Sequence, residues 1–212
     1  MTSSHLNFDP QAADLGFDPY DLLIHAVAPR PIAFVSTVTP DGKPNLAPFS
    51  FFMGGGSNPV SVCFSPCTKE DGSFKDTLRN IEATREFVIH TVTFEMAEGV
   101  VKSSRPLPYG SSEWPDSGFT PLPSLKVKPP RVAEAPFAME CRLHTVVHHG
   151  SGADAANYVI GEVVMFHVAE DLMRNDPGEL EPGSVDYLAR LGGGWYSRIQ
   201  PESLFVMRRP TS

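Results

Sequence analysis

The stretch that decides the fold is RPIAFVSTVTPDGKPNLAPFSFFM, residues 30–53. The run 32–38 is apolar and β-branched almost throughout, which is typical of a strand buried on both faces. Pro-Asp-Gly at 40–42 then predicts a turn, because Pro presets φ, Asp supports the turn and Gly adopts a positive φ. A second run, 46–53, returns along the first. The stretch therefore predicts a β-hairpin.

The second run carries a serine, Ser50, between Phe49 and Phe51, and three glycines follow at 54–56. A small polar residue beside backbone that lacks side chains is a place where a flat ligand can lie against the main chain. The alternative is an ordinary barrel hairpin that happens to contain a serine. The hairpin alone does not decide between them.

Length and composition indicate one globular domain over residues 1–212, in which 1–29 form an N-terminal arm. The chain is 41% hydrophobic and 20% charged, with a net charge of −8 and a pI of about 5.3. No run of Lys and Arg occurs, so we expect no nucleic acid as partner. No apolar stretch reaches membrane-spanning length and no signal-peptide pattern is present, so we expect no membrane association and a cytoplasmic location.

Cysteine and histidine usage points to neither a disulfide framework nor a metal site. The three cysteines are Cys63, Cys67 and Cys141, an odd number without a C-x-x-C spacing. His144 and His148 share a strand face, but no acidic residue or cysteine is spaced to complete a metal site with them. We therefore expect reduced cysteines and no metal.

The remaining pattern predicts an antiparallel barrel of about seven strands with two or three short helices. Strands are expected at 60–64, 86–93, 132–148, 158–168 and 204–207, and helical segments at 20–24, 94–102 and 185–191. His90 is expected to be a packed or edge histidine. The region 103–124 is rich in Pro, Gly and Ser and contains Tyr109 and Trp114; it either anchors itself to the surface or stacks on a flat partner.

A further helix is indicated by Phe74, Leu78 and Ile81, which follow helical spacing. Ser73 and Asp76 have the spacing of a capping box, so the helix is expected to start just after Ser73. The first turn then holds 75–77, Lys-Asp-Thr, where free N–H groups and the positive end of the helix dipole favour a phosphate. Plain capping beside a solvated lysine is the alternative.

Several kinds of enzyme are excluded by missing motifs. The sequence has no G-x-G-x-x-G after a strand, no Walker loop, no G-x-S-x-G elbow and no H-E-x-x-H. The features not excluded are a β-barrel, a helix N-terminus at 75–77 that could bind a phosphate, and a strand with Ser-Phe-Phe at 50–52.

These motifs together resemble the flavin reductase-like family of FMN-binding split barrels, in particular the branch called DIM6/NTAB, which includes reductase components of two-component monooxygenases. The resemblance covers about residues 17–207 and rests on the order and spacing of its parts. These are RPIAFVST at 30–37, NLAPFSFF at 45–52, Ser65 with KDT at 75–77 and NI at 80–81, EFVIH at 86–90, Glu140-Cys141, GEVV with His167, and RLGGGWYSR at 190–198.

The resemblance implies a homodimeric split β-barrel that holds FMN at the subunit interface. The backbone at Ser50, Phe51 and Phe52 would bind the pyrimidine edge of the flavin. Ser65, Lys75 and Thr77 would hold the phosphate, with Asp76 capping the helix. Arg190 and Tyr196 match a C-terminal motif near the flavin pocket. NADH or NADPH would be the electron donor, and a monooxygenase component could receive the reduced flavin.

One departure from the family concerns turnover. The shorter NADH-dependent members carry Gly-Asp-His before the penultimate long strand, whereas this chain reads Asp-Ala-Ala-Asn at 154–157. The candidates to replace that histidine are His148 and His149 in the same loop, with Tyr196 as a further catalytic candidate. The alternatives to a reductase are a flavin-binding carrier or sensor without turnover, and a related barrel for heme or pyridoxal phosphate, which the KDT motif argues against.

Overall fold

The computed structural model describes residues 4–173 and 180–210. The strands in this part are β1 (Arg30–Pro31), β2 (Ala33–Val38), β3 (Pro44–Phe49), β4 (Phe52–Ser57), β5 (Val60–Phe64), β6 (Glu86–His90), β7 (Pro121–Leu122), β8 (Arg131–Val132), β9 (Phe137–His149), β10 (Ala156–Val168), β11 (Tyr187–Arg190) and β12 (Tyr196–Ile199). The helices are α1 (Pro19–Ala26), α2 (Asp76–Thr84), α3 (Ala97–Lys102) and α4 (Trp114–Ser117), with 3₁₀ turns η1 (Phe94–Met96), η2 (Glu170–Leu172) and η3 (Pro201–Ser203). The expected mainly β, antiparallel architecture is confirmed.

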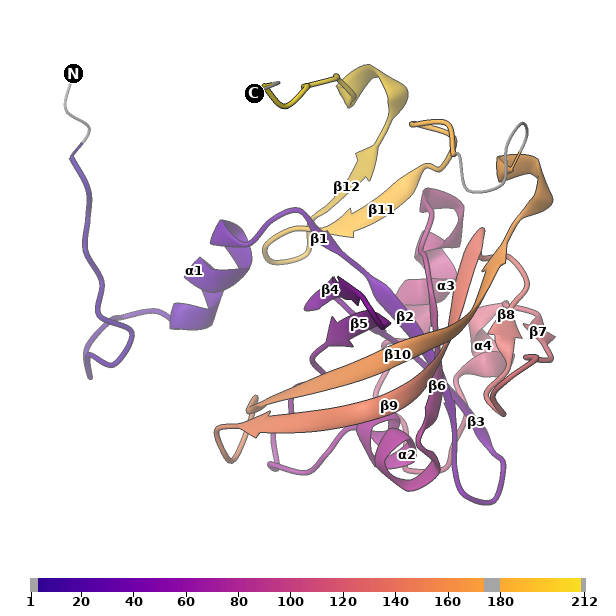
Figure 1. Ribbon diagram of the computed structural model, residues 1–212. Coiled ribbons are helices and arrows are strands. Elements are labelled where there is room, and N and C mark those ends of the chain that lie inside the picture. Colours follow the sequence, from indigo (N-terminus) through magenta and orange to yellow (C-terminus); the bar gives the residue numbers. More distant parts are fainter. Residues whose placement is uncertain (1–3, 174–179, 211–212) are drawn as a thin grey trace.

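Seven strands form one antiparallel sheet in the order β3-β2-β6-β9-β10-β5-β4 (Figure 1). The two edge strands, β3 and β4, are consecutive in the chain and are separated only by Ser50 and Phe51. Because so short a link spans at most about 11 Å, the end of β3 and the start of β4 must lie close together. The sheet therefore has to curl, and its two edges meet at Ser50 and Phe51.

The predicted hairpin is confirmed for its first two strands. Every residue of β2 is buried. Its side chains alternate between two hydrophobic clusters, with Val35 in one and Phe34 in the other. Gly42 takes the expected positive φ of 89° in the turn. The second run is not one strand, however, because the chain leaves β2 after Phe49 and continues as β4 beside β5.

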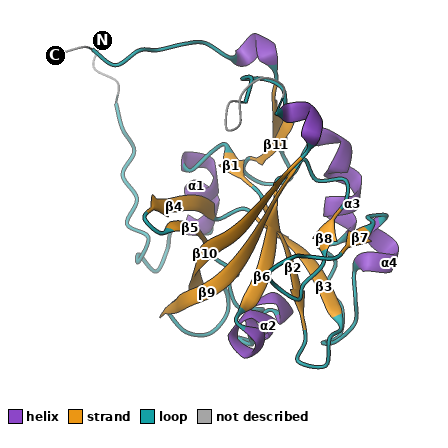
Figure 2. Ribbon diagram, turned by 45° about the vertical axis from the view of Figure 1, so that its right-hand side comes forward, coloured by secondary structure: helices purple, strands orange, loops and turns teal. Residues whose placement is uncertain are grey.

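A smaller sheet of β1, β11 and β12 lies on one side of the large one (Figure 2). The predicted helical turn at 185–191 is wrong, because 187–190 pairs as β11 with both β1 and β12. The predicted strand at 204–207 is also wrong. The chain makes the turn η3 there and then continues without regular structure, its side chains strongly exposed and without a strand partner in the described residues.

Helix α2 packs Leu78 and Ile81 into the core as the spacing predicted. Phe74, the third residue of the predicted stripe, lies before the helix and is exposed. Its start differs from the expectation. The helix begins at Asp76 with Lys75 at the N-cap position, and no side chain caps it. Ser73 instead donates its N–H to Asp71 Oδ1 at 2.8 Å and offers its carbonyl to the Lys69 N–H at 2.8 Å. The capping box is therefore wrong, since Ser73 belongs to the preceding turn.

The long loop 103–124 anchors itself to the protein. Trp114 begins the short helix α4 and is buried. Tyr109 lies under the Arg79 guanidinium, whose carbon is 3.6 Å from the ring centroid. Both aromatic side chains thus fix the loop, which agrees with the first of the two expectations.

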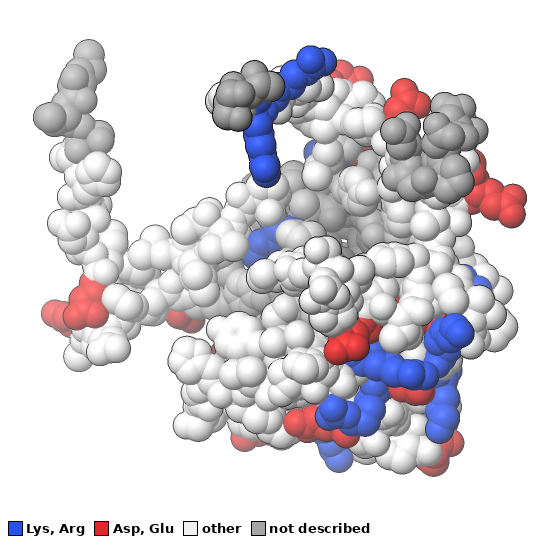
Figure 3. Space-filling model, in the orientation of Figure 1, with Lys and Arg blue, Asp and Glu red and all other residues white. Residues whose placement is uncertain are grey.

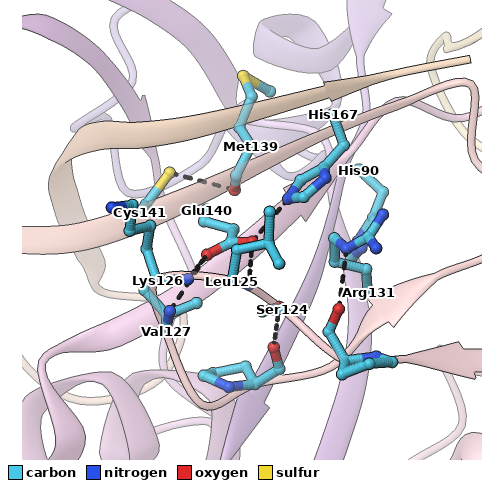
Figure 4. Close-up of polar contacts among 12 residues, drawn as sticks. His90, Ser124, Leu125, Lys126, Val127, Arg131, Met139, Glu140, Cys141 and His167 are labelled. Carbon is cyan, nitrogen blue, oxygen red and sulfur yellow. Dashed lines mark hydrogen bonds and ion pairs between the residues drawn. The ribbon is translucent and has the colours of Figure 1, made fainter.

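A buried acidic group fixes the loop 124–128 against the sheet (Figure 4). Glu140 on β9 is fully buried, and its carboxylate accepts N–H groups from Leu125, Lys126 and Val127. His167 Nε2 lies 2.6 Å from the same carboxylate. Burial alone would raise the pKa of Glu140, but the N–H groups and His167 hold the pKa below its ordinary value. Glu140 is thus a structural anchor.

His90 is packed, as expected. The Val132 N–H donates to His90 Nε2 at 3.0 Å, so the other nitrogen, Nδ1, carries the proton and donates to the Phe34 carbonyl at 2.8 Å. Burial lowers the pKa of His90 to about 4. The ring is therefore neutral at physiological pH and ties β6 to β2 and β8.

No helix in 4–173 or 180–210 has both the length and the apolar character needed to cross a membrane.

The packing of Gly161 generates a stability prediction. A Cβ added there would overlap the fully buried ring of Phe87, with Cε1 at 2.9 Å. Because overpacking a core costs about 1–3 kcal/mol, Gly161→Ala should lower the free energy of unfolding by that amount in a denaturant titration. Gly194→Ala is the control, since its Cβ meets nothing within 4 Å. Equal stability of the two variants would contradict the packing argument.

Candidate functional site

A cavity of about 610 Å³ lies between β3, the start of α2 and the loop after α3. Its β3 wall is formed by Asn45 and Ala47–Phe49, and its floor by Lys75–Thr77. The remaining lining comes from Lys69–Asp71, Ser103–Leu107 and Glu113. Two of the three residues predicted to hold the phosphate, Lys75 and Thr77, thus share one cavity with the predicted cap Asp76, whereas Ser65 does not line it.

The start of α2 offers unused hydrogen-bond donors to this cavity. The first N–H groups of a helix have no partner within the helix, and no side chain caps α2. Lys75 is exposed, and its ammonium forms no ion pair within the described part of the chain. The arrangement fits a phosphate group, because an anion here would gain both the N–H groups and the lysine charge.

Thr77 and Asp76 contribute differently from what the sequence suggested. Thr77 is 1% exposed and its Oγ1 accepts a hydrogen bond from Asn45 Nδ2 at 3.0 Å, which leaves its own proton free to donate. Asp76 forms an ion pair with Lys69 at 2.9 Å, and within the described residues its carboxylate accepts no N–H of the helix N-terminus.

Ser50, Phe51 and Phe52 follow Phe49 directly but do not line the cavity. An antiparallel strand rises about 3.4 Å per residue, so Ser50 lies roughly 17 Å along β3 from Asn45, which marks the phosphate end. The Phe51 carbonyl accepts the Ser65 N–H at 2.9 Å. The candidate residues thus fall at two ends of one strand.

Arg30 organises the end at Ser50. Its guanidinium donates to the carbonyls of Ile24 at 2.6 Å, Val27 at 2.8 Å and Leu191 at 2.9 Å, and its Nε donates to Ser50 Oγ at 3.3 Å. Its carbon also lies 5.7 Å from the centroid of the Phe51 ring. Burial lowers the pKa of Arg30, and Arg190 acts in the same direction while Tyr20 opposes it.

Arg190 and Tyr196 lie at this same end. They are a cross-strand pair of β11 and β12, with the guanidinium carbon 4.5 Å from the centroid of the tyrosine ring. Arg190 also pairs with Arg30 across β1 and β11, and Arg30 in turn binds Ser50. The structure therefore brings the C-terminal motif toward Ser50 and away from Lys75.

Ser65 is linked to His148 through Asn157. Ser65 Oγ accepts the Asn157 N–H at 3.2 Å, and His148 Nδ1 lies 2.7 Å from Asn157 Oδ1. Asn157 Nδ2 donates to the Pro66 carbonyl at 3.0 Å, so its Oδ1 is the acceptor and His148 the donor. The His148 ring also stacks on Phe74, with centroids 5.3 Å apart.

His149 is exposed and its ring lies 6.4 Å from that of Tyr158. No group of three or more His, Cys, Asp or Glu side chains with metal-binding geometry occurs in the part of the chain that is described. Cys63, Cys67 and Cys141 are all free thiols.

Charge on the visible face is mixed near the cavity elements. Figure 3 shows blue and red side chains interspersed in the region that α2 and β3 occupy in Figure 1, whereas the surface over α1 and β4 is largely uncharged. The cavity is thus not part of an extended basic patch.

The sequence assigned no contact or role to four residues of this region, although three of them lie in motifs quoted above: Arg30, Asn45, Glu113 and Asn157. Arg30 carried one signal, since it stands between two prolines at the entry to a buried strand. For Asn45 and Glu113 no local signal exists, because their partners are 32 and 67 residues away.

Comparison with known proteins agrees with this picture. The flavin reductase like domain matches residues 25–185. An uncharacterized protein of Halalkalibacterium halodurans is 40% identical over 194 residues, covering 91% of this chain and 91% of that protein. The protein YwrF of Bacillus subtilis is 33% identical over 196 residues, covering 92% and 94%.

Solved structures are similar over nearly the whole length. Nitrilotriacetate monooxygenase component B from Bacillus cereus superposes with a TM-score of 0.87 and 32% identity, covering 97% of this chain and all of that one. The 2-nitrobenzoate 2-nitroreductase NbaA from Pseudomonas fluorescens has a TM-score of 0.81 and 29% identity, covering 94% and 96%. A split-barrel protein of Shewanella frigidimarina, at 20% identity and TM-score 0.76 over 91% of each chain, supports the fold alone. The split-barrel expectation is confirmed.

Proposed function

Because this chain belongs to the flavin reductase-like family, we propose that it binds FMN and reduces it with NADH or NADPH. The observation that carries the proposal is the cavity at the start of α2. It is lined by uncapped N–H groups, by the Thr77 hydroxyl and by Lys75, which has no ion pair among the described residues. These groups would hold the phosphate. When bound, the flavin supplies the ring that accepts the hydride.

The other protein groups act by binding and orientation. The backbone from Ser50 to Phe52, held by Arg30, would receive the ring end of the flavin, with Arg190 and Tyr196 beside it. Ser65 is placed beside Phe51 through the backbone bond between them. No acidic or basic side chain is required for this reaction, since orientation of the two rings is the main demand.

A similar solved structure supports a monooxygenase as the partner of this protein. The similar Bacillus cereus structure is by its title a monooxygenase component, which supports transfer of reduced flavin from this chain to a monooxygenase. The free cysteines and the acidic pI of about 5.3 favour a reducing cytoplasmic compartment.

The phosphate assignment is tested with Lys75→Ala. Hydrogen bonds to a charged group contribute about 1.5–3 kcal/mol, and 1.4 kcal/mol is tenfold. FMN should therefore bind about tenfold more weakly or worse, while riboflavin affinity stays nearly constant, both followed by fluorescence titration. Lys43→Ala is the matched control, because Lys43 is exposed and does not line the cavity. Equal losses for FMN and riboflavin would refute the assignment.

The role of the loop histidines in flavin reduction is tested by comparing the variants His148→Ala and His149→Ala. His148 is tied to Ser65 through Asn157 and is the candidate to replace the family's missing histidine, whereas no hydrogen bond joins His149 to this group in the described residues. Because misplaced groups commonly cost about 100-fold in rate, we expect His148→Ala to slow flavin reduction at least tenfold with unchanged FMN affinity, and His149→Ala to have little effect.

The measurement is NADH and NADPH oxidation with added FMN. If wild type is active and neither variant matters, another group positions the nicotinamide, and Arg190 and Tyr196 become the next candidates. If wild type oxidises neither nucleotide, the reductase proposal fails. A flavin-binding carrier or sensor, favoured by Asn157 in place of the histidine, then takes its place.

We further propose a homodimer. Leu22 and Leu23 on α1, Val27 just after it, Met53 on β4 and Val60 on β5 are exposed apolar residues. Tyr20 of α1 contacts Phe51, which directly precedes β4, with ring centroids 6.2 Å apart (Figure 2). Such a patch is expected to be covered. Light scattering of the FMN-loaded protein at micromolar concentration should give twice the chain mass of 23.1 kDa. A monomer mass would contradict the proposal.

A further inference from the structure

Glu113 is a buried carboxylate on the cavity wall. It stands at the start of α4, is 9% exposed, and its Oε2 accepts the Leu46 N–H at 2.9 Å. Because β3 is an edge strand, this N–H points away from the sheet and needs such an acceptor. No ion pair involves Glu113 in residues 4–173 and 180–210.

Glu113 lies near the candidate phosphate groups. It binds the backbone of Leu46, and the adjacent residue, Asn45, binds Thr77. The charge of Asp76, next to Thr77 in the chain, contributes to the environment of Glu113. A phosphate held by Lys75 and Thr77 would therefore face Glu113 across the same cavity.

The neighbouring cations do not neutralise the negative charge of the Glu113 carboxylate. Among the cations that line the cavity, Lys69 is paired with Asp76 and Arg105 with Asp116. The remaining carboxylates of the lining, Glu70 and Asp71, add negative charge. On α3, which packs against α4, Lys102 is already paired with Glu98. Lys75 alone of the lining cations has no acidic partner in the described residues.

We propose that binding of the flavin phosphate is coupled to uptake of one proton by Glu113. The neutral carboxyl keeps one oxygen on the Leu46 N–H and turns its O–H toward the cavity, which removes the repulsion between the carboxylate and the phosphate. This inference rests on the proposed FMN site and adds a proton to its binding equilibrium.

The direction of the pH dependence follows from the environment. Burial raises the pKa of Glu113, and the Asp76 charge adds to this, while the Leu46 N–H opposes it. A bound phosphate dianion raises this pKa further. Since the protonated form binds FMN more tightly, FMN affinity falls as pH rises above the pKa of Glu113 in the free protein, by at most tenfold per pH unit, and levels off above its pKa in the complex.

The experiment is calorimetric titration of the full chain with FMN at pH 7.5, in two buffers that differ in ionisation enthalpy and contain no phosphate. The flavin phosphate, whose own second pKa is about 6, is then already a dianion. The buffer difference should reveal uptake of a measurable fraction of one proton per FMN, and no such uptake with riboflavin. Over pH 7–8.5, FMN affinity should fall more steeply than riboflavin affinity.

Glu113→Gln is the decisive variant, because glutamine still accepts the Leu46 N–H but cannot titrate. Proton uptake should vanish, and FMN should bind more tightly than to wild type at pH 8.5. Glu70→Gln is the control: Glu70 lines the same cavity but is exposed, so uptake should persist.

Other outcomes separate this inference from the proposed function. If FMN binds and Glu113→Gln shows the same proton count as wild type, the coupling is wrong while the FMN site stands. If FMN does not bind wild type, the proposed function itself fails and the coupling with it. If the glutamine variant does not fold, the wild-type difference between FMN and riboflavin decides, and equal proton counts overturn the inference.

Discussion

The hydrogen bonds of the Arg30 guanidinium hold the site region together. A buried cation is costly unless its donors are satisfied, and here three carbonyls and the Ser50 hydroxyl meet that demand. The carbonyls belong to the end of α1, just before Arg30 in the chain, and to the turn between β11 and β12, 161 residues away, so with Ser50 one side chain joins three segments. Because Ser50 is the fourth partner, the position of the candidate flavin strand depends on the same bonds.

Two buried carboxylates show how solvation separates a structural role from a functional one. Three backbone N–H groups and His167 surround the carboxylate of Glu140. They stabilise its negative charge, so Glu140 stays ionised. Glu113 has a single N–H and an open cavity beside it. Glu140 is therefore held in one protonation state by its neighbours, whereas the protonation state of Glu113 depends on what binds in the cavity.

The sequence predicted what depends on local pattern. The hairpin turn at Gly42, the buried strand β2 and the helix stripe of Leu78 and Ile81 all arise from neighbours in the chain, and all three are confirmed. Strand β11 was missed because it is short and pairs with Arg30 and Pro31, about 160 residues away. The contacts of Glu113 and Asn157 were out of reach for the same reason, since they join segments that only the folded chain brings together.

The two-residue link between β3 and β4 restricts how this protein can evolve. Inserting or deleting one residue at Ser50 or Phe51 would shift β4 by one position against β5, and every side chain of β4 would then face the opposite side of the sheet. The turn after β2 and the tip of the β9–β10 hairpin, in contrast, join adjacent strands at the surface and tolerate changes in length. Ligand preference at the link can therefore diverge among relatives through substitutions, while its length stays fixed.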